Sequence, residues 1–182
     1  MNFVHMEVLY GREEIKNKVA ELGNTISNDY AGRELLVVGI LKGAFIFMAD
    51  LVREIKVPLE IDFMDVSSYG LSTSSSGEVR IIKDLEYSIQ DKEVLIIEDI
   101  VDTGLTLKHI TDILRTRNPK SIKICCLLDK PSRRKVNVIA DYVGYSIPDR
   151  FVVGYGLDYA EQYRNYPEIC IIKPSVDGNI TE

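Results

Sequence analysis

Three carboxylates lie close together where an apolar run ends. Glu98 and Asp99 directly follow residues 94–97, and Asp102 comes three positions after Asp99. Paired carboxylates accept hydrogen bonds from hydroxyl groups or bind a metal ion, whereas they repel phosphate. Asp102 could accept a proton or stabilise positive charge. The cluster therefore favours a ligand that presents hydroxyl groups or a cation.

A turn rich in hydroxyl groups follows at once. It contains Thr103, Gly104 and Thr106, and it precedes a segment with helical character. Backbone N–H groups and hydroxyls at the start of a helix form a site for an anion of the size of phosphate. Gly104 lets the backbone approach such a ligand closely. Together with the carboxylates, the turn predicts a ligand with a sugar diol beside a phosphate, such as a ribose 5-phosphate.

A purely structural interpretation of the same segment competes with the ligand site. Asp102 or Thr103 could be an ordinary helix N-cap, and the preceding carboxylates could be a solvated strand end. Other phosphate motifs fit less well, because the chain has no GxxxxGK[ST] sequence and hence no P-loop. A phosphatase motif of the DxDx[TV] type is excluded, since its two aspartates would stand two positions apart.

The apolar pattern indicates which elements position these residues. Ile15, Val19, Leu22 and Ile26 recur at helical spacing, which predicts a helix over residues 12–30. Further helices are expected at 43–55 and 107–117. Strands are expected at 34–41, 59–69, 78–85, 93–100 and 121–129, a mobile loop at 70–78, and a strand-rich C-terminal third that includes 138–147, 149–159 and 168–174.

Strands alternate with helices through the first two-thirds of the chain, which predicts an α/β fold with a doubly wound, mostly parallel sheet. Residues 34–41 have no polar face, as is typical of a parallel strand covered on both sides. Ligands of such sheets bind at the carboxyl ends of the strands, which is where residues 94–97 lead into the acidic cluster. No repeat or linker divides the chain, so we expect a single domain over residues 1–182.

Composition limits the classes of protein to consider. The chain has 182 residues, 46% of them hydrophobic, and a net charge of −6, which argues against a broad basic surface for nucleic acid. It contains no apolar run long enough for a membrane span and no signal peptide. Cys125, Cys126 and Cys170 lie in apolar runs, which suggests buried thiols rather than disulfides or a zinc site. We expect a cytoplasmic protein.

Residues 94–107, VLIIEDIVDTGLTL, resemble the phosphoribosyl diphosphate (PRPP) motif of type I phosphoribosyltransferases. Four further segments, in order along the chain, resemble the hypoxanthine-guanine phosphoribosyltransferase family: LKGAF (41–45), SSYG (67–70), LLDKPSRR (127–134) and DRFVVGYGLDYAEQYRN (149–165). The resemblance implies the type I phosphoribosyltransferase fold, with a core at about residues 34–130. A small hood subdomain would come from the C-terminal third and the N-terminus.

The resemblance implies roles for the central motif. Glu98 and Asp99 would meet the ribose hydroxyls, and Asp102 would lie near N7 of the purine as the proton acceptor. The loop that binds the 5-phosphate would consist of Thr103, Gly104, Leu105 and Thr106. Leu105 stands where some family members have lysine, so hydroxyls and amides would hold the phosphate here.

The resemblance also implies a pyrophosphate site and a lid. Leu41, Lys42 and Gly43 match the loop that binds pyrophosphate, often through a non-proline cis peptide before the lysine, and Arg164 matches an arginine on pyrophosphate. The alternatives are a plain strand-to-helix turn and an exposed helix arginine. Ser68 and Tyr69 resemble the start of a lid over PRPP, which would keep water from an oxocarbenium-like carbon. An ordinary disordered loop is the alternative.

The purine would be held by residues of the last two matching segments. Lys130 would donate to the 6-oxo group, Phe151 would stack on the base, Val152 would meet the base edge through its backbone, and Asp158 would lie near the metal and the base. The alternatives are a solvated lysine in the basic run KPSRRK and a core strand of Phe-Val-Val.

The implied activity is Mg²⁺-dependent transfer of the 5-phosphoribosyl group from PRPP to N9 of hypoxanthine or guanine, giving IMP or GMP and pyrophosphate. Glu98, Asp99 and Asp158 would be the carboxylates near the metal. We expect a homo-oligomer, a dimer or a tetramer, with no nucleic-acid or membrane partner. The competing hypothesis is a regulator of the same fold that senses PRPP or nucleotides and binds RNA or DNA, but that class needs a basic face or an added DNA-binding domain.

Overall fold

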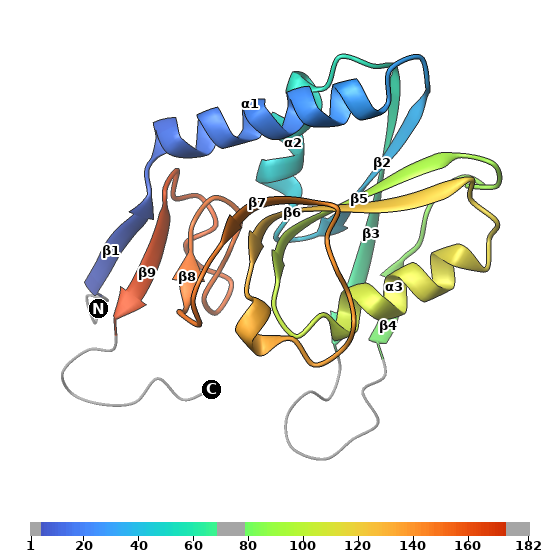
Figure 1. Ribbon diagram of the computed structural model, residues 1–182. Helices are drawn as coiled ribbons and strands as arrows, with labels where there is room; N and C mark the ends of the chain where they lie inside the picture. The colour runs from blue at the N-terminus through green and yellow to red at the C-terminus, as the bar shows by residue number, and fades with distance from the viewer. Residues whose placement is uncertain (1–4, 69–78, 174–182) are drawn as a thin grey trace.

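The computed structural model describes residues 5–68 and 79–173 (Figure 1). The helices are α1 (Arg12–Asp29), α2 (Phe45–Glu54) and α3 (Leu105–Arg115), with a short 3-10 turn η1 (Pro131–Arg133). The strands are β1 (His5–Tyr10), β2 (Leu35–Leu41), β3 (Leu59–Ser68), β4 (Val79–Lys83), β5 (Glu93–Val101), β6 (Ser121–Asp129), β7 (Tyr142–Ser146), β8 (Val152–Val153) and β9 (Ile169–Lys173). The loop expected at 70–78 lies outside the described residues.

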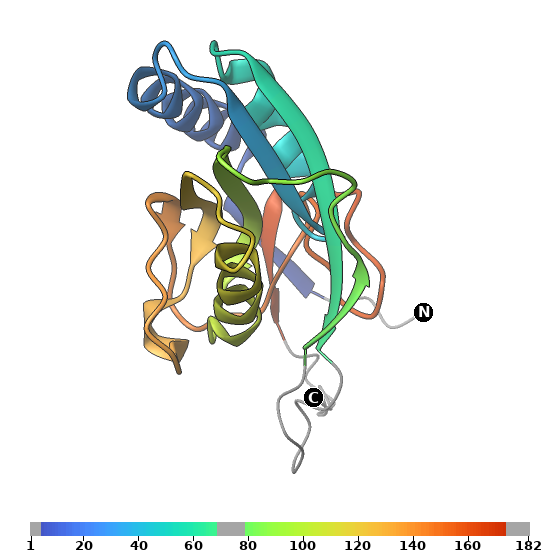
Figure 2. The same ribbon diagram turned by 90° about the vertical axis from the view of Figure 1, so that its right-hand side faces the viewer.

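The main sheet confirms the doubly wound fold. Among the described residues its strand order is β4-β3-β2-β5-β6-β7, and every neighbouring pair is parallel except β3 with β4. Strands β2 and β3 run side by side, with β4 along the end of β3 (Figure 2). The order reverses between β2 and β5, which pair from Leu35 with Glu93 to Gly39 with Ile97. Ligands bind at such a switch point, at the carboxyl ends of the strands.

Helices cover both faces of this sheet. Leu35 and Val37 of β2 share one buried cluster with residues of α1 and α2, whereas Leu36 and Val38 share another with residues of α3. Alternate side chains of β2 therefore enter different cores, which explains why the strand has no polar face. The predicted helical stripe of α1 is confirmed, because its four apolar residues are all buried in the first cluster.

A second, antiparallel sheet has the order β1-β9-β8 and lies near the start of α1 (Figure 1). Strands β7, β8 and β9 make the C-terminal third strand-rich, as expected, although β8 comprises only Val152–Val153 of the segment 149–159. The backbone then turns through Gly154, Tyr155 and Gly156, whose φ angles are 94°, 52° and 102°. A left-handed backbone cannot continue an extended strand, so the chain leaves the sheet and reaches the edge that carries the acidic cluster.

Strand β5 carries Glu98 and Asp99, as expected, and continues to Val101, because β6 pairs with it as far as Val101 with Asp129. The acidic pair is therefore held by a strand. Helix α3 begins at Leu105, two residues earlier than expected, so the hydroxyl-rich turn leads directly into its first turn.

The three cysteines are buried free thiols, as predicted. No helix in the described ranges combines the length and the apolar character needed to cross a membrane.

Candidate active site

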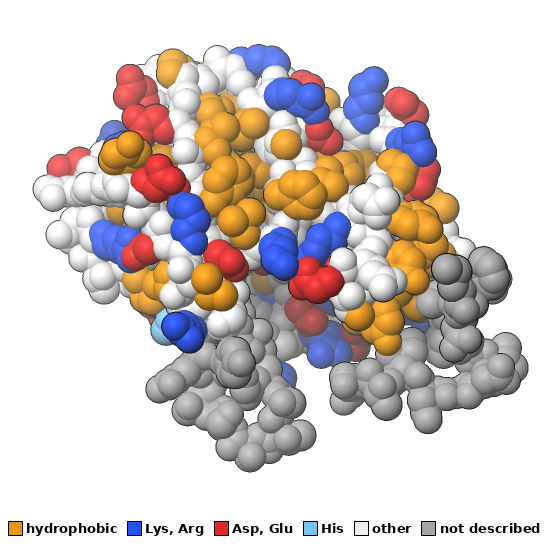
Figure 3. All heavy atoms as spheres, turned by 180° about the vertical axis from the view of Figure 1, so that it is seen from behind, with side chains coloured by type: hydrophobic (Ala, Val, Ile, Leu, Met, Phe, Trp, Pro, Cys, Tyr) orange, Lys and Arg blue, Asp and Glu red, His pale blue; other side chains and the backbone are white. Residues whose placement is uncertain are grey.

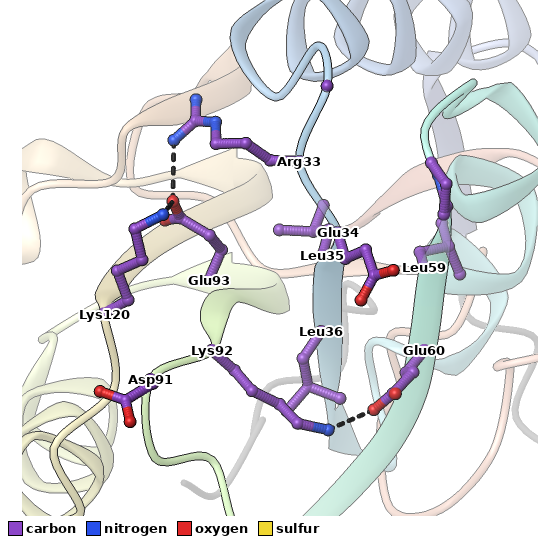
Figure 4. Close-up of a pocket in the computed structure, with 12 residues that line it drawn as sticks. Arg33, Glu34, Leu35, Leu36, Leu59, Glu60, Asp91, Lys92, Glu93 and Lys120 are labelled. Atoms are coloured by element: carbon purple, nitrogen blue, oxygen red, sulfur yellow. Dashed lines mark hydrogen bonds and ion pairs between the residues drawn. The ribbon is translucent and has the colours of Figure 1, made fainter.

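A cavity of about 190 Å³ opens at the carboxyl ends of β2 and β5. Its lining residues are Ile40, Leu41, Val66, Glu98, Ile100, Val101, Asp102, Thr103, Gly104, Thr106 and Leu107. Larger cavities of about 470 Å³ and 660 Å³ lie at the opposite edge of the sheet (Figure 4) and beside α1 and α2, and one of about 300 Å³ lies beside Ile61 and Tyr87. None of these three cavities contains a predicted site residue, so the smaller one is the candidate site.

The acidic pair has an electrostatic environment that suits a cation or hydroxyl donors. Burial raises the pKa of Glu98, and the adjacent Asp99 carboxylate raises it further. Burial also raises the pKa of Asp99, although the backbone N–H of Ile100 donates to its Oδ1 at 2.7 Å. Two partly buried carboxylates in contact repel each other, and a bound cation or hydroxyl donor would relieve that repulsion.

The turn after β5 has the features of an anion site. Gly104 is the N-cap of α3, with φ of 80° and no side-chain cap, so neither Asp102 nor Thr103 is an ordinary N-cap. The first N–H bonded within the helix is that of Lys108, which donates to the Gly104 carbonyl at 2.9 Å. The backbone amides of the first helical turn therefore have no acceptor within the helix, although the Leu105 N–H donates to Thr103 Oγ1 at 3.4 Å, and such amides can bind an anion.

Lys130, one of the predicted purine residues, is buried beside this turn. Lys130 is only 7% exposed, so it is not a solvated surface lysine, and its backbone N–H donates to the Val101 carbonyl at 2.9 Å. Burial lowers the pKa of Lys130, whereas the nearby Asp102 and Asp149 raise it. Phe151 is 46% exposed, so its ring does not belong to the core.

The exposed ring of Phe151 contacts one aromatic ring, and the next residue in the sequence, Val152, is buried. It meets Tyr159 edge-on, with ring centroids 5.5 Å apart. Val152 is buried within β8 and pairs with Ile171 of β9. Strand pairing thus fixes the backbone beside Phe151 while its ring stays free to stack on a ligand.

The predicted pyrophosphate residues also come together. Lys42 Nζ lies 2.9 Å from Glu161 Oε2, and Arg164 Nη2 lies 3.5 Å from Glu161 Oε1. Arg164 is not an exposed helix arginine: its side chain is 20% exposed, and its Nη1 donates to the Gly156 carbonyl at 2.8 Å. Its Nε is buried and has no acceptor. An orphaned guanidinium donor at this point favours an anionic ligand.

The turn at 41–43 is packed closely from two sides. The Leu41–Lys42 peptide is cis. Gly43 lies against the Asp99 carboxylate, and a Cβ placed on Gly156 would come 2.2 Å from the Gly43 carbonyl oxygen. The loop that follows β8 therefore contacts the turn at residues 41–43 directly.

Asp158 pairs with another predicted site residue, and most of the predicted lid lies outside the described residues. The Asp158 carboxylate pairs with Arg164 Nη2 at 2.8 Å and accepts from the Glu161 N–H at 2.9 Å. Within the described residues, no group of three or more potential ligand side chains could hold a metal ion, so Glu98, Asp99 and Asp158 do not form one three-carboxylate group. Ser68 is the last residue of β3, and Tyr69 lies outside the described residues.

Sequence reasoning assigned no role to three charged residues of the site: Arg133, Asp149 and Glu161. Arg133 Nε lies 2.9 Å from Asp102 Oδ1, and Glu161 contacts both cations of the predicted pyrophosphate site. All three lie inside the segments that resemble the family, and this resemblance was the sequence feature that could have indicated them. Their partners are distant in the chain, so spacing alone did not indicate them.

A doubly wound sheet with an acidic pair and an anion-binding turn at its switch point defines the class of phosphoribosyltransferases. The phosphoribosyl transferase domain family model matches residues 7–160, and the chain belongs to this family, in its hypoxanthine-guanine branch.

Relatives of that branch match nearly the whole chain. Hypoxanthine-guanine phosphoribosyltransferase of Bacillus subtilis is 58% identical over 170 residues, which cover 93% of this chain and 94% of the relative. The Staphylococcus aureus protein of the same name is 57% identical over 173 residues, covering 95% and 97%. A crystal structure of a hypoxanthine phosphoribosyltransferase from Staphylococcus aureus superimposes with a TM-score of 0.91 at 57% identity, covering 95% of this chain and 94% of that one.

Proposed function

We propose that this protein transfers the 5-phosphoribosyl group of PRPP to N9 of hypoxanthine or guanine, giving IMP or GMP and pyrophosphate, as an enzyme of purine salvage. The relatives at 57% and 58% identity support this activity. The observation that carries it is the buried Lys130, whose backbone N–H donates to the Val101 carbonyl just before the hydroxyl-rich turn and whose ammonium lies 3.9 Å from Asp149. An ammonium group donates to a 6-oxo group and cannot accept from an amino group.

The residues of the site divide the chemistry among them. N9 forms a bond with C1′ of the ribose while the bond from C1′ to the pyrophosphate oxygen breaks, and Asp102 accepts the proton released from N7 of the base. Glu98 and Asp99 accept from the ribose hydroxyls, and the turn before α3 holds the 5-phosphate. Lys42 and Arg164 stabilise the negative charge of the leaving group, so that catalysis comes from positioning and electrostatics.

We propose Mg²⁺ as the metal of this reaction. The raised pKa values of Glu98 and Asp99 fit a pair that a cation relieves. The lack of a three-carboxylate group in the described residues fits an ion that takes most of its ligands from substrate phosphates and water. When bound with PRPP, Mg²⁺ neutralises charge on the departing pyrophosphate.

We also propose that the protein forms a homo-oligomer. Hydrophobic side chains gather over the middle of one face of the molecule (Figure 3). Large apolar side chains are exposed on α2 and β3, at Phe45 and Ile61. Contiguous apolar surface marks interaction sites, and sedimentation velocity at several protein concentrations tests this proposal.

The activity is tested by incubating the protein with PRPP and Mg²⁺ and with each of hypoxanthine, guanine, xanthine and adenine. Formation of IMP and GMP that depends on PRPP supports the proposal, and its absence refutes it. No finding supports the competing hypothesis of a regulator that binds RNA or DNA.

A further inference from the structure

Four charged side chains of alternating sign form a chain of contacts beside the candidate purine site. Arg133 Nε lies 2.9 Å from Asp102 Oδ1, and Arg133 Nη1 lies 3.4 Å from Asp149 Oδ2. Asp149 Oδ1 lies 3.9 Å from Lys130 Nζ. This series of ion pairs therefore links Asp102, the predicted proton acceptor, to Lys130, the predicted hydrogen-bond donor to the 6-oxo group.

Lys130 is the buried member of this series of ion pairs, and Asp149 is its partner. The Lys130 side chain is 8% exposed, and among the described residues Asp149 is the carboxylate within ion-pair distance of its ammonium. A lysine head group is a point charge on a flexible stem, so it takes its direction from the acceptors around it. At 3.9 Å Asp149 attracts the ammonium without taking a hydrogen bond from it, so the N–H donors of Lys130 stay available for a ligand.

At the other end of the series, Asp102 has a carboxylate oxygen without a hydrogen-bond partner. Asp102 Oδ1 is buried, and its 2.9 Å contact with Arg133 Nε lacks hydrogen-bond geometry. The Asp102 backbone is held from the other side, because Arg134 Nη1 donates to its carbonyl at 2.6 Å while Arg134 also pairs with Asp129. Arg134 thus holds the Asp102 backbone and Arg133 faces its carboxylate, which keeps one oxygen without a hydrogen bond; this favours a ligand that donates a hydrogen bond there.

We propose that Asp149 and Arg133 are positioning residues for the purine base. Asp149 directs the Lys130 ammonium toward the 6-oxo group, and Arg133 couples Asp149 to Asp102, so that the donor and the proton acceptor stand at a set separation. This inference rests on the proposed function and extends it to two residues outside the base-contacting set. The guanidinium suits this bridge because its planar fork contacts two carboxylates at once.

The first test compares Asp149→Asn with Asp112→Asn, which removes the same charge from the surface of α3, where Asp112 pairs with Lys108. Asp149→Asn should raise KM for hypoxanthine about three- to fivefold, the size expected for a half-exposed ion pair, while KM for PRPP stays within about twofold. The ratio of kcat/KM for hypoxanthine to that for adenine should also fall. An unchanged hypoxanthine KM, or an equal rise in both KM values, would overturn the proposal.

The second test replaces Arg133 by Lys and by Met. Arg133→Met should show the same selective rise in KM for hypoxanthine, and Arg133→Lys should restore part of it, because lysine keeps the charge but contacts one carboxylate at a time. Equal KM values in the two variants would contradict the bridging role.

Calorimetric titration of IMP separates this inference from the proposed function. Asp149→Asn should bind IMP about three- to fivefold more weakly than wild type, with unchanged affinity for pyrophosphate. Equal IMP affinities would overturn the inference. If wild type binds IMP but shows no turnover with PRPP, the proposed function fails, and the comparison of IMP affinities still decides the role of Asp149.

Discussion

The carboxylate of Asp99 occupies the space that a side chain at Gly43 would need. A Cβ on Gly43 would lie 1.7 Å from Asp99 Oδ2, far inside van der Waals contact. The turn at residues 41–43 and the acidic pair can therefore be this close only because residue 43 is glycine. A misplacement of about 1 Å at a reacting centre can cost about 10²-fold in rate.

Gly43→Ala should accordingly lower kcat/KM with PRPP by at least about 10²-fold, since the turn or the carboxylate must move. Steady-state kinetics against PRPP measures the effect. The control is Gly11→Ala, because a Cβ at Gly11 would meet nothing closer than 3.4 Å. If Gly43→Ala and Gly11→Ala had similar activity, the close packing of Gly43 against Asp99 would not matter for catalysis.

Asp102→Asn should lower kcat by about 10²–10⁴-fold, because it keeps the shape of the side chain and removes the proton acceptor. PRPP affinity, measured by calorimetry, should change little. A variant with near-normal kcat would disprove the role given to Asp102.

Adenine should be a very poor substrate, because its 6-amino group would present a donor to the buried Lys130. Sites built around such a polar contact reject the mismatched analogue by about 10⁴–10⁵, and we expect kcat/KM for adenine to be at least about 10³-fold below that for hypoxanthine. Lys130→Ala should narrow the ratio, chiefly by impairing hypoxanthine. Adenine activity within about tenfold of hypoxanthine would mean that Lys130 does not read the base.

Removing divalent metal with excess EDTA should abolish turnover, because the pyrophosphate would leave without charge compensation. Activity should return when Mg²⁺ is added beyond the chelator. Full turnover in EDTA would refute the proposal of a metal.

Stability should fall in acid through Glu93, at the edge of the sheet opposite the site. Its carboxylate accepts a hydrogen bond from Ser121 and lies 3.0 Å from Arg33 Nη1 and 3.2 Å from Lys120 Nζ (Figure 4). These contacts lower the pKa of Glu93 to about 2. A lowered folded-state pKa gives stability that is present above the unfolded value near 4.5 and is lost as pH falls toward 2. The shift corresponds to about 3 kcal/mol of unfolding free energy.

Urea denaturation between pH 6 and pH 2.5 tests this linkage. Glu93→Gln should lower the unfolding free energy at pH 6 and flatten its decline below about pH 4.5. Glu60→Gln is the control, since Glu60 is exposed and pairs only with Lys92 among the described residues. Parallel pH profiles for wild type and Glu93→Gln would contradict the assignment.

The sequence by itself determined the elements and the family. Apolar residues that recur every three or four positions along 12–30 form α1, and the continuous run at 34–41 forms β2, because such patterns record which side of a local segment is buried. The acidic pair and the hydroxyl-rich turn were also evident, since their chemistry lies in consecutive residues. Five ordered segments were enough to identify the phosphoribosyltransferase family.

Only the tertiary structure decided which of these residues meet. The contacts of Gly43 with Asp99, of Arg133 with Asp102 and Asp149, and of Lys42 with Glu161 join segments that are distant in the chain. Local periodicity carries no information about such pairs. They arise because parallel strands bring their carboxyl ends to one edge, and because the left-handed turn after β8 carries residues 154–164 onto that edge.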